Sequence, residues 1–360
     1  MPGIEEFMSQ LRASFTSLVL TVMVLGMTPT PTHAQVAITA TADQVTVDID
    51  GKPFTVFHTG GPTLNRVYLH PLRAATGTVV NRSFPAGQLP GETTDHPHHA
   101  GLFYGHGDVN GFNFWAIQNV ATRVGEPAAD PTRPLPGSAG PAPTDATLGR
   151  IVPKGPVKVS SGKQVGTIDV VLSWNKPDGA PLLTETRRMT FHAHPTLRIV
   201  DVDIDLQAIE RAQFRDTKEG TFALRVATAL EEPPKVAKAG APVRTGRLRN
   251  AEGGEGEAQV WGKRSAWVDY AGRIGEEPVG IVLMDHPSNP RHPTYWHSRG
   301  YGLHAINPFG LHDFLNDPKA DGSMTLEPGQ HARFRYRMVI HPGLAPEKLA
   351  ALYKDWAATR

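Results

Sequence analysis

The chain contains no cysteine in 360 residues. This absence excludes disulfide bonds, thiolate metal sites and thiol nucleophiles together. Any catalysis must therefore use histidine, carboxylates, lysine, tyrosine, hydroxyl groups or a metal ion. A hydrophobic content of 39% and a charged content of 20% indicate a folded globular protein rather than a disordered or fibrous one.

The chain also lacks long runs of like charge. Its 36 Lys and Arg residues nearly balance 35 Asp and Glu residues, which gives a formal net charge of +1. Proteins that bind nucleic acid or anionic lipid carry a basic patch or stripe, and the sequence shows none. We therefore expect neither nucleic acid nor an anionic membrane surface as a partner.

The longest apolar run is near the N-terminus, at residues 15–27, and its thirteen residues are short of the roughly 20 that span a bilayer. It is followed by 28-TPTPTHAQ-35, in which Thr32 and Ala34 form a small-residue pattern typical of signal-peptide cleavage. Residues 1–34 are thus predicted to be a signal peptide cleaved after Ala34. The mature protein would be periplasmic or secreted, with no membrane insertion after cleavage.

Beyond residue 35 the hydrophobic pattern has a period of two. Apolar and charged residues alternate in 197-LRIVDVDIDL-206 and 333-RFRYRMVI-340, as in strands with one buried face. Residues 176-KPDG-179 predict a hairpin turn between strands at 167–174 and 182–192. An amphipathic helix is indicated only at 345–359. The predicted fold is all-β, a large antiparallel sandwich over residues 35–344 followed by a short C-terminal helix within 345–360.

Two stretches interrupt the strand pattern. Residues 125–146 are rich in proline, alanine and glycine, and residues 232–258 are rich in glycine and charged residues. Both are interpreted as surface excursions of one domain, with a domain boundary as the alternative.

Titratable residues crowd the segment 95-DHPHHAGLFYGHGDVNG-111. Imidazole titrates within the physiological pH range, so His98 and His99 are candidates for proton transfer and His106 for substrate binding. The alternative for each histidine is a structural hydrogen bond. A divalent metal ion at His96, His98 and His99 is a further alternative, and no organic cofactor is expected.

A second cluster, 285-DHPSNPRHPTYWHSRGYGLHAINPFGLHDF-314, mixes histidine and arginine with aromatic residues. Aromatic faces beside such polar side chains are typical of sugar sites. We take His297 as a proton-transfer candidate and Arg291, Trp296, Arg299 and Asn307 as substrate-binding candidates. Core packing is the alternative for the aromatic residues.

A third candidate, 216-DTKEG-220, places Asp216, Lys218 and Glu219 directly before a predicted strand at 221–228. Asp216 and Glu219 are taken as a carboxylate pair and Lys218 as a substrate-binding residue, with surface ion pairs as the alternative. In an extended backbone, however, Glu219 would point away from Asp216 and Lys218.

Several long segments carry a resemblance to a known family: 70-HPLRAATGTVVNRSFP-85, 94-TDHPHHAGLFYGHGDVNGFNFW-115, 216-DTKEG-220, 261-WGKRSAWVDY-270 and 285-DHPSNPRHPTYWHSRGYGLHAINPFG-310. Together they resemble the bacterial family labelled PmoA-like or DUF6807 over roughly residues 40–342. The resemblance implies a galactose-mutarotase-like β-supersandwich. It also implies an exported protein of glycan-degrading bacteria.

The sequence therefore predicts an exported carbohydrate-active enzyme, a glycoside hydrolase or a lyase, whose partner is an oligosaccharide or polysaccharide. A non-catalytic sugar-binding module and a metal-dependent enzyme are the alternatives. We expect the two histidine-rich segments to form one site, with His98 or His99 close to His297 and Arg299 across a concave pocket.

Overall fold

The computed structural model describes residues 35–60, 65–117, 146–236 and 239–359. The predicted signal peptide and all but the last residue of the 125–146 insert lie outside these ranges. Within the described part of the chain, no helix is long and apolar enough to cross a membrane.

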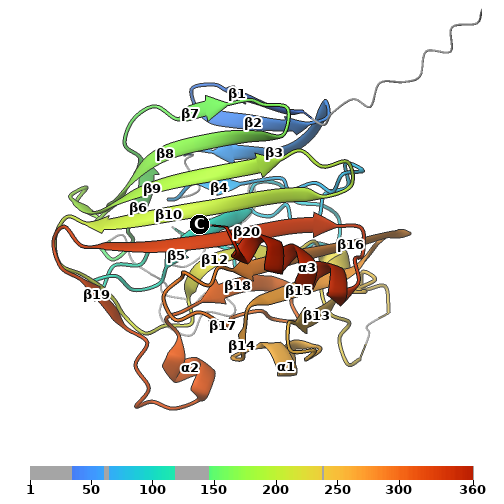
Figure 1. Cartoon of the computed structure of the whole chain (residues 1–360). Coiled ribbons are helices and arrows are strands. Elements are labelled where there is room, and N and C mark those ends of the chain that lie inside the picture. The colour runs from blue at the N-terminus through green and yellow to red at the C-terminus, as the bar shows by residue number, and fades with distance from the viewer. Residues whose placement is uncertain (1–34, 61–64, 118–145, 237–238, 360) are drawn as a thin grey trace, which may run out of the picture. The chain divides into compact units, whose positions relative to one another are not determined.

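Two nine-stranded antiparallel sheets make up most of the fold (Figure 1). The first sheet runs β1 (Val36–Ala40), β2 (Gln44–Ile49), β3 (Lys52–His58), β4 (Tyr68–Leu69), β5 (Leu102–His106), β12 (Gly220–Arg225), β18 (Leu303–Asn307), β17 (Thr294–Trp296) and β14 (Arg264–Ser265). The second runs β13 (Arg247–Asn250), β15 (Trp267–Ile274), β16 (Glu277–Asp285), β20 (His331–His341), β10 (Arg198–Ala208), β9 (Pro181–His192), β8 (Val165–Asn175) and β6 (Arg150–Pro153), with β7 (Lys158–Ser160) also paired to β8. A small sheet joins β11 (Ala212–Phe214) to β19 (Met324–Leu326).

The predicted strands and hairpin are present. In β10 and β20 the apolar residues of the alternating pattern are buried, while on the other face Asp201 lies opposite Arg337 and Asp203 opposite Arg335. The β8–β9 hairpin turns at Gly179, whose φ of +87° suits glycine. The prediction of an all-β fold with large antiparallel sheets is confirmed.

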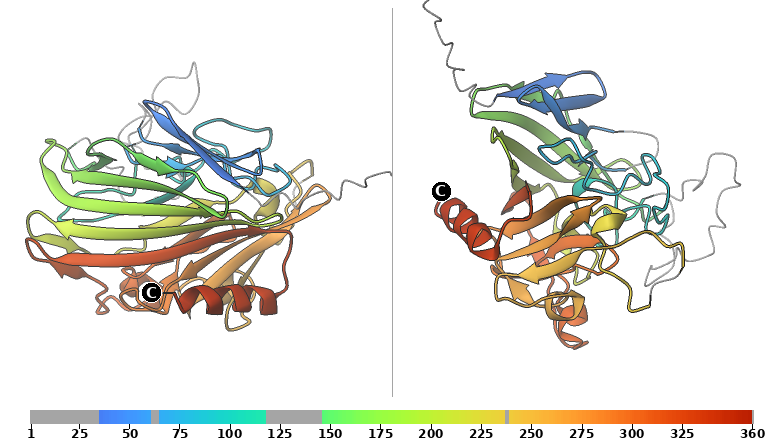
Figure 2. Two further views of the ribbon diagram at one scale, coloured as in Figure 1. Left: turned by 45° about the horizontal axis from the view of Figure 1, so that its top comes forward. Right: turned by 90° about the vertical axis from the view of Figure 1, so that its right-hand side faces the viewer.

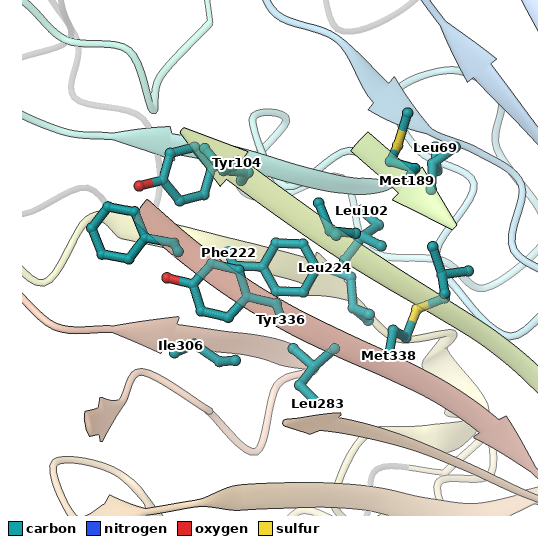
Figure 3. Close-up of a cluster of buried hydrophobic side chains, with 14 of the residues drawn as sticks. Leu69, Leu102, Tyr104, Met189, Phe222, Leu224, Leu283, Ile306, Tyr336 and Met338 are labelled. Atoms are coloured by element: carbon teal, nitrogen blue, oxygen red, sulfur yellow. The ribbon is translucent and has the colours of Figure 1, made fainter. Parts of the chain in front are cut away.

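The hydrophobic core lies between the two large sheets. Figure 3 shows side chains from both sheets meeting there, and the rings of Phe222 on β12 and Tyr336 on β20 stack with centroids 4.6 Å apart. Period-two alternation supplies these residues, because Phe222 and Leu224 point inward while Ala223 points to the opposite face.

The helices are short and peripheral. The predicted C-terminal helix is α3 (Pro346–Ala357), which buries Leu349 and Trp356 on the outer face of the second sheet (Figure 2). Two helices that the sequence pattern did not indicate are α1 (Glu257–Val260) and α2 (Leu311–Leu315), and a 3-10 turn, η1, covers Thr228–Leu230. Residues 232–258 are not an excursion throughout, because they contain β13, whose Leu248 is fully buried, and the start of α1.

Candidate active site

The outer face of the first sheet carries small residues at its centre. Ala223 on β12 and Ala305 on β18 point to this face, beside Phe103 on β5. Because these side chains are small, the loops around Ala100 and Trp115 pack directly on the sheet and form a second hydrophobic cluster. The histidine-rich loop before β5 is therefore buried against the sheet.

Arg225 on β12 points to this face, two residues from Ala223, and Glu219, directly before β12, also reaches it, beside His98 and His99. Glu219 is held by its backbone, because its carbonyl accepts a hydrogen bond from the Gly107 N–H at 2.7 Å. A Cβ at position 107 would lie 2.7 Å from the Glu219 Cβ, so only glycine permits this approach.

His98 and His99 lie beside Glu219. One ligand atom from each of the three side chains falls within 4.8 Å of the others. The His98 and His99 rings are 4.3 Å apart at an interplanar angle of 79°, and both pack against Trp115. This arrangement brings the adjacent His98 and His99 together with Glu219, which is distant in the sequence.

Burial shifts the pKa of all three side chains in the direction that disfavours the charged form. It lowers the pKa of both His98 and His99 well below 6.5, and neighbouring histidine and arginine charges add to this effect. Burial also raises the pKa of Glu219, partly offset by the nearby Lys218 ammonium group. Perturbed groups of this kind concentrate at functional sites.

His96 occupies the middle of the cluster and forms a dyad with Asp95. The His96 Nδ1 lies 2.7 Å from an Asp95 carboxylate oxygen, so Nδ1 carries the proton and donates it. The His96 ring stacks on His99 at 4.9 Å and on Tyr301 at 5.1 Å. The residue has a φ of +46°, an uncommon conformation for a side chain other than glycine.

Two buried arginines hold the dyad. The other Asp95 oxygen accepts hydrogen bonds from Arg82 at 3.1 Å and from Arg225 at 3.2 Å. Arg225 also contacts the buried Glu231 at 3.3 Å and lies over the Tyr301 ring at 4.7 Å. Burial alone would raise the pKa of Asp95, but the hydrogen bond with His96 and the Arg225 charge outweigh it and hold that pKa well below its usual range.

A charged groove of about 790 Å³ opens beside this cluster. Its wall includes Asp95, Arg225 and Tyr301 from the cluster. The remaining charged residues of its lining are Glu231, Glu232, Lys235, Arg244, Arg247, Glu255 and Glu257. Since Asp95 and Tyr301 both contact His96, the groove adjoins the Asp95–His96 dyad.

The two histidine-rich segments meet, because His96 of the first stacks on Tyr301 of the second. His297 is buried, with its Nδ1 2.7 Å from the Lys218 carbonyl, and burial lowers its pKa to about 3. Arg299 pairs with Glu257 at 2.8 Å and lies 5.6 Å from the Tyr301 ring.

Other predicted residues have structural contacts instead. Trp296 is fully buried and donates to the Ser265 carbonyl at 2.9 Å, so it has no exposed face for a sugar. His106 is fully buried, with its Nε2 2.8 Å from the Arg215 carbonyl. Asn307 donates to the Thr217 carbonyl, and Arg291 donates to the carbonyls of Pro308, Gly322 and Ser323.

The predicted carboxylate pair is not assembled. The Asp216 carboxylate lies 2.5 Å from His312 Nδ1 and accepts from the Gly322 N–H, at the base of α2. Glu219 points to the histidine cluster instead, from a bend formed by Lys218 and Glu219. Lys218 lies 4.0 Å from Asp313, which makes it an ion-pair partner there.

A family model described as a family of unknown function, DUF6807, matches residues 44–354. The chain belongs to the DUF6807 family. The comparison with curated proteins gives no match.

Solved structures with a similar fold share little sequence with this DUF6807 chain. A galactose 1-epimerase from Lactobacillus acidophilus NCFM is 9% identical, with a TM-score of 0.38 over 86% of this chain and 99% of its own. The GH36 α-galactosidase AgaA from Geobacillus stearothermophilus is 11% identical, with a TM-score of 0.35 over 86% of this chain. The chain spans about 40% of the length of that α-galactosidase. Similarity at this level says nothing about substrate or reaction.

Sequence reasoning missed the groups that orient His96 in the DUF6807 chain. Asp95 and Tyr301 stood in the segments quoted above but received no role, and Arg82, Arg225 and Glu231 lay outside the candidate set. A signal existed in the strand that begins at Gly220, where the charged Arg225 follows the apolar run 221-TFAL-224. A charged residue at the end of a buried strand requires a partner.

Proposed function

We propose that this protein is an exported carbohydrate-active enzyme that acts on a glycan fragment by proton transfer, as a lyase rather than as a two-carboxylate hydrolase. The observation that carries the proposal is the Asp95–His96 dyad, whose Asp95 lines the groove and whose His96 stacks on the groove residue Tyr301. With Nδ1 donating to Asp95, the Nε2 lone pair of His96 is free to accept a proton. The neighbouring Asp95 orients the ring and stabilises the imidazolium that forms.

The groove suits a glycan in size and chemistry. Its volume of about 790 Å³ is that of a small-molecule site. Carboxylates and guanidinium groups in its lining can pair with hydroxyl groups, and the Tyr301 ring offers an aromatic surface. These features support an oligosaccharide as the ligand.

An elimination fits the available groups better than hydrolysis. Classical hydrolysis needs two carboxylates across one glycosidic bond, and Asp216 is committed to His312 and Gly322. In the elimination, His96 removes a proton from the carbon next to a uronic carboxylate, a carbon–carbon double bond forms, and the bond to the glycosidic oxygen breaks. Tyr301, whose pKa burial raises to about 12, is protonated at neutral pH and can protonate the leaving oxygen.

The test is product analysis with a panel of oligosaccharides that includes uronic acids. We expect products with no added water and a new ultraviolet absorbance, and loss of product in His96→Ala. His192→Ala is the matched control, because His192 also pairs with an aspartate, Asp201, at 2.7 Å. Products that each gain one water would establish hydrolysis instead, and binding without turnover would establish a sugar-binding module.

A further inference from the structure

We propose that His98, His99 and Glu219 bind one divalent transition-metal ion. The three side chains present ligand atoms within 4.8 Å of one another. Two imidazoles and a carboxylate are a common ligand set for Zn²⁺ and for non-haem Fe²⁺. The inference concerns the cluster behind the dyad, and it does not rest on the reaction proposed above.

The strongest support is the unpaired nitrogen atoms of His99. This side chain is 1% exposed, and neither of its ring nitrogens has a hydrogen-bond partner among the described residues. The buried Nδ1 of His98 also has none. Buried polar groups without partners are rare and costly, and one ion would pair one nitrogen of each ring, so these two imidazoles favour a bound cation.

Glu219 adds the negative charge that a cation site needs. In the described part of the chain, no lysine, arginine or histidine nitrogen lies within ion-pair distance of its carboxylate. By contrast, two other acids near the groove are paired: Asp95 with Arg82 and Arg225, and Glu231 with Arg225 and Arg244. A metal ion would pair Glu219 in the same way.

Ring geometry selects His98 and His99 over His96. A metal ion lies in the plane of each imidazole that binds it, along the nitrogen lone pair. The His96 and His99 rings are nearly parallel, at 4° and 4.9 Å apart, so no ion can lie in both planes. The His98 and His99 planes cross at 79°, which allows a shared ion. The metal site that the sequence analysis gave as an alternative used His96, His98 and His99. In the ligand set proposed here, Glu219 takes the place of His96.

The fold holds the ligands in place. The loop is closed by a hydrogen bond of 3.0 Å from the His99 N–H to the His96 carbonyl, and Arg66 donates to the His98 carbonyl. Ligand atoms that share a tetrahedral ion lie roughly 3.4 Å apart, for bonds of about 2.1 Å. Side-chain rotations that shift the ligand atoms by about an ångström would therefore bring them to the separations that a tetrahedral ion requires.

The donor set favours a first-row transition ion over Ca²⁺ or Mg²⁺, because those ions prefer oxygen ligands alone. We therefore choose Zn²⁺ as the binding probe and Co²⁺ as the spectroscopic probe. The protein should be the untagged mature chain, stripped with a chelator, so that no added histidines compete.

Calorimetric titration with Zn²⁺ should show one ion bound per chain, and binding should raise the melting temperature. Glu219→Gln and His99→Asn should weaken binding at least about tenfold, since even residues that only orient metal ligands contribute this much. Glu185→Gln and His304→Asn are the matched controls, because both replace buried residues outside the cluster. They should leave the Zn²⁺ affinity unchanged.

Spectroscopy of the wild-type protein provides a test that does not depend on the variants folding. X-ray absorption of the Zn²⁺ form should show two imidazole ligands, and the Co²⁺ form should show visible bands of a site with nitrogen and oxygen ligands. Failure of the wild type to bind Zn²⁺ or Co²⁺, or a ligand count other than two imidazoles, would overturn the inference. Because no sugar is present, these results are independent of the lyase proposal.

Discussion

Replacing Asp95 by asparagine should destabilise the protein and disable His96 at the same time. The Asp95 carboxylate faces two buried guanidinium groups, Arg82 with no exposed surface and Arg225 with 1%. Removing one partner of a buried ion pair costs about 3–5 kcal/mol. Arg82 keeps the carbonyls of Thr93, Asp95 and His96 as acceptors, and Arg225 keeps Glu231. Because these acceptors remain and the Asp95 side chain is itself 28% exposed, we expect a loss of about 2–3 kcal/mol in the free energy of unfolding.

Urea unfolding followed by tryptophan fluorescence measures this loss. The control is Asp203→Asn, since the Asp203 carboxylate pairs with Arg335 at 2.9 Å but is 43% exposed. Such exposed pairs contribute about 0–1 kcal/mol. Equal effects of the two substitutions, both below about 1 kcal/mol, would show that the buried charges are not coupled as described.

The difference in unfolding free energy between the wild type and Asp95→Asn depends on pH, because the pKa of Asp95 is lowered in the folded state. A carboxylate whose folded pKa is depressed contributes stability above its unfolded pKa of about 3.9, and this is lost as the pH falls through the folded value. The free energy of unfolding of the wild type should therefore exceed that of Asp95→Asn by the same amount at every pH from 7 to 5. The margin should shrink only below about pH 4.

The substitution should also reverse the tautomer of His96. Arg82 and Arg225 are donors, so they fix the asparagine oxygen on their side and turn its NH₂ group toward His96 Nδ1. The ring must then accept at Nδ1 and carry its proton on Nε2. Nitrogen NMR of His96 reports the tautomer, and a comparable reversal beside a catalytic histidine lowers kcat by about 10⁴. An unchanged tautomer with full activity would contradict the assigned role of the dyad.

Four further predictions follow from single residues. Gly107→Ala should cost about 1–3 kcal/mol in urea unfolding and weaken Zn²⁺ binding, because the new Cβ would meet Glu219. Trp296→Ala should cost about 3–5 kcal/mol without a specific effect on sugar affinity, as a core residue does. The pKa of His304 is lowered by burial to about 4, so stability should fall as the pH drops from 6.5 toward 4, and His304→Asn should reduce this slope by about 1.4 kcal/mol per pH unit. Mass spectrometry of the exported protein should find Gln35 at the N-terminus, and a retained leader would contradict the signal-peptide prediction.

The fold was largely predictable because its long strands repeat one simple pattern. In β10 and β20, alternation over ten or more residues identifies the buried face without tertiary information. Short strands such as β4 and β14, with two residues each, carry no period and were not predictable. The strand β13 was not predicted, because residues 232–258 are rich in charged residues, although its Leu248 is fully buried.

The sequence predicted which residue types gather at the site, but it did not predict which residues contact one another. The histidine-rich segments could be identified because titratable residues crowd them, and they do contact each other. Residue type alone could not show that Trp296 faces the core or that Arg291 binds backbone carbonyls. The pairing of Asp95 with Arg82 and Arg225 depends on which strands are neighbours, since these residues come from β12 and from two loops. Such contacts depend on which strands pair and in which register. The hydrophobic pattern of a single sequence does not give this information.

The location of the site follows from residue size on the outer face of the first sheet. The inner face carries large residues such as Phe222 and Leu224, so the second sheet packs on it. On the outer face Ala223 and Ala305 are too small to cover the sheet, and the loop that carries His98 and His99 fills the space. Because that loop lies on the sheet, its imidazoles lose water and approach Glu219 at the start of β12. The small residues therefore create the buried, water-poor setting in which unpaired nitrogen atoms favour binding of a cation.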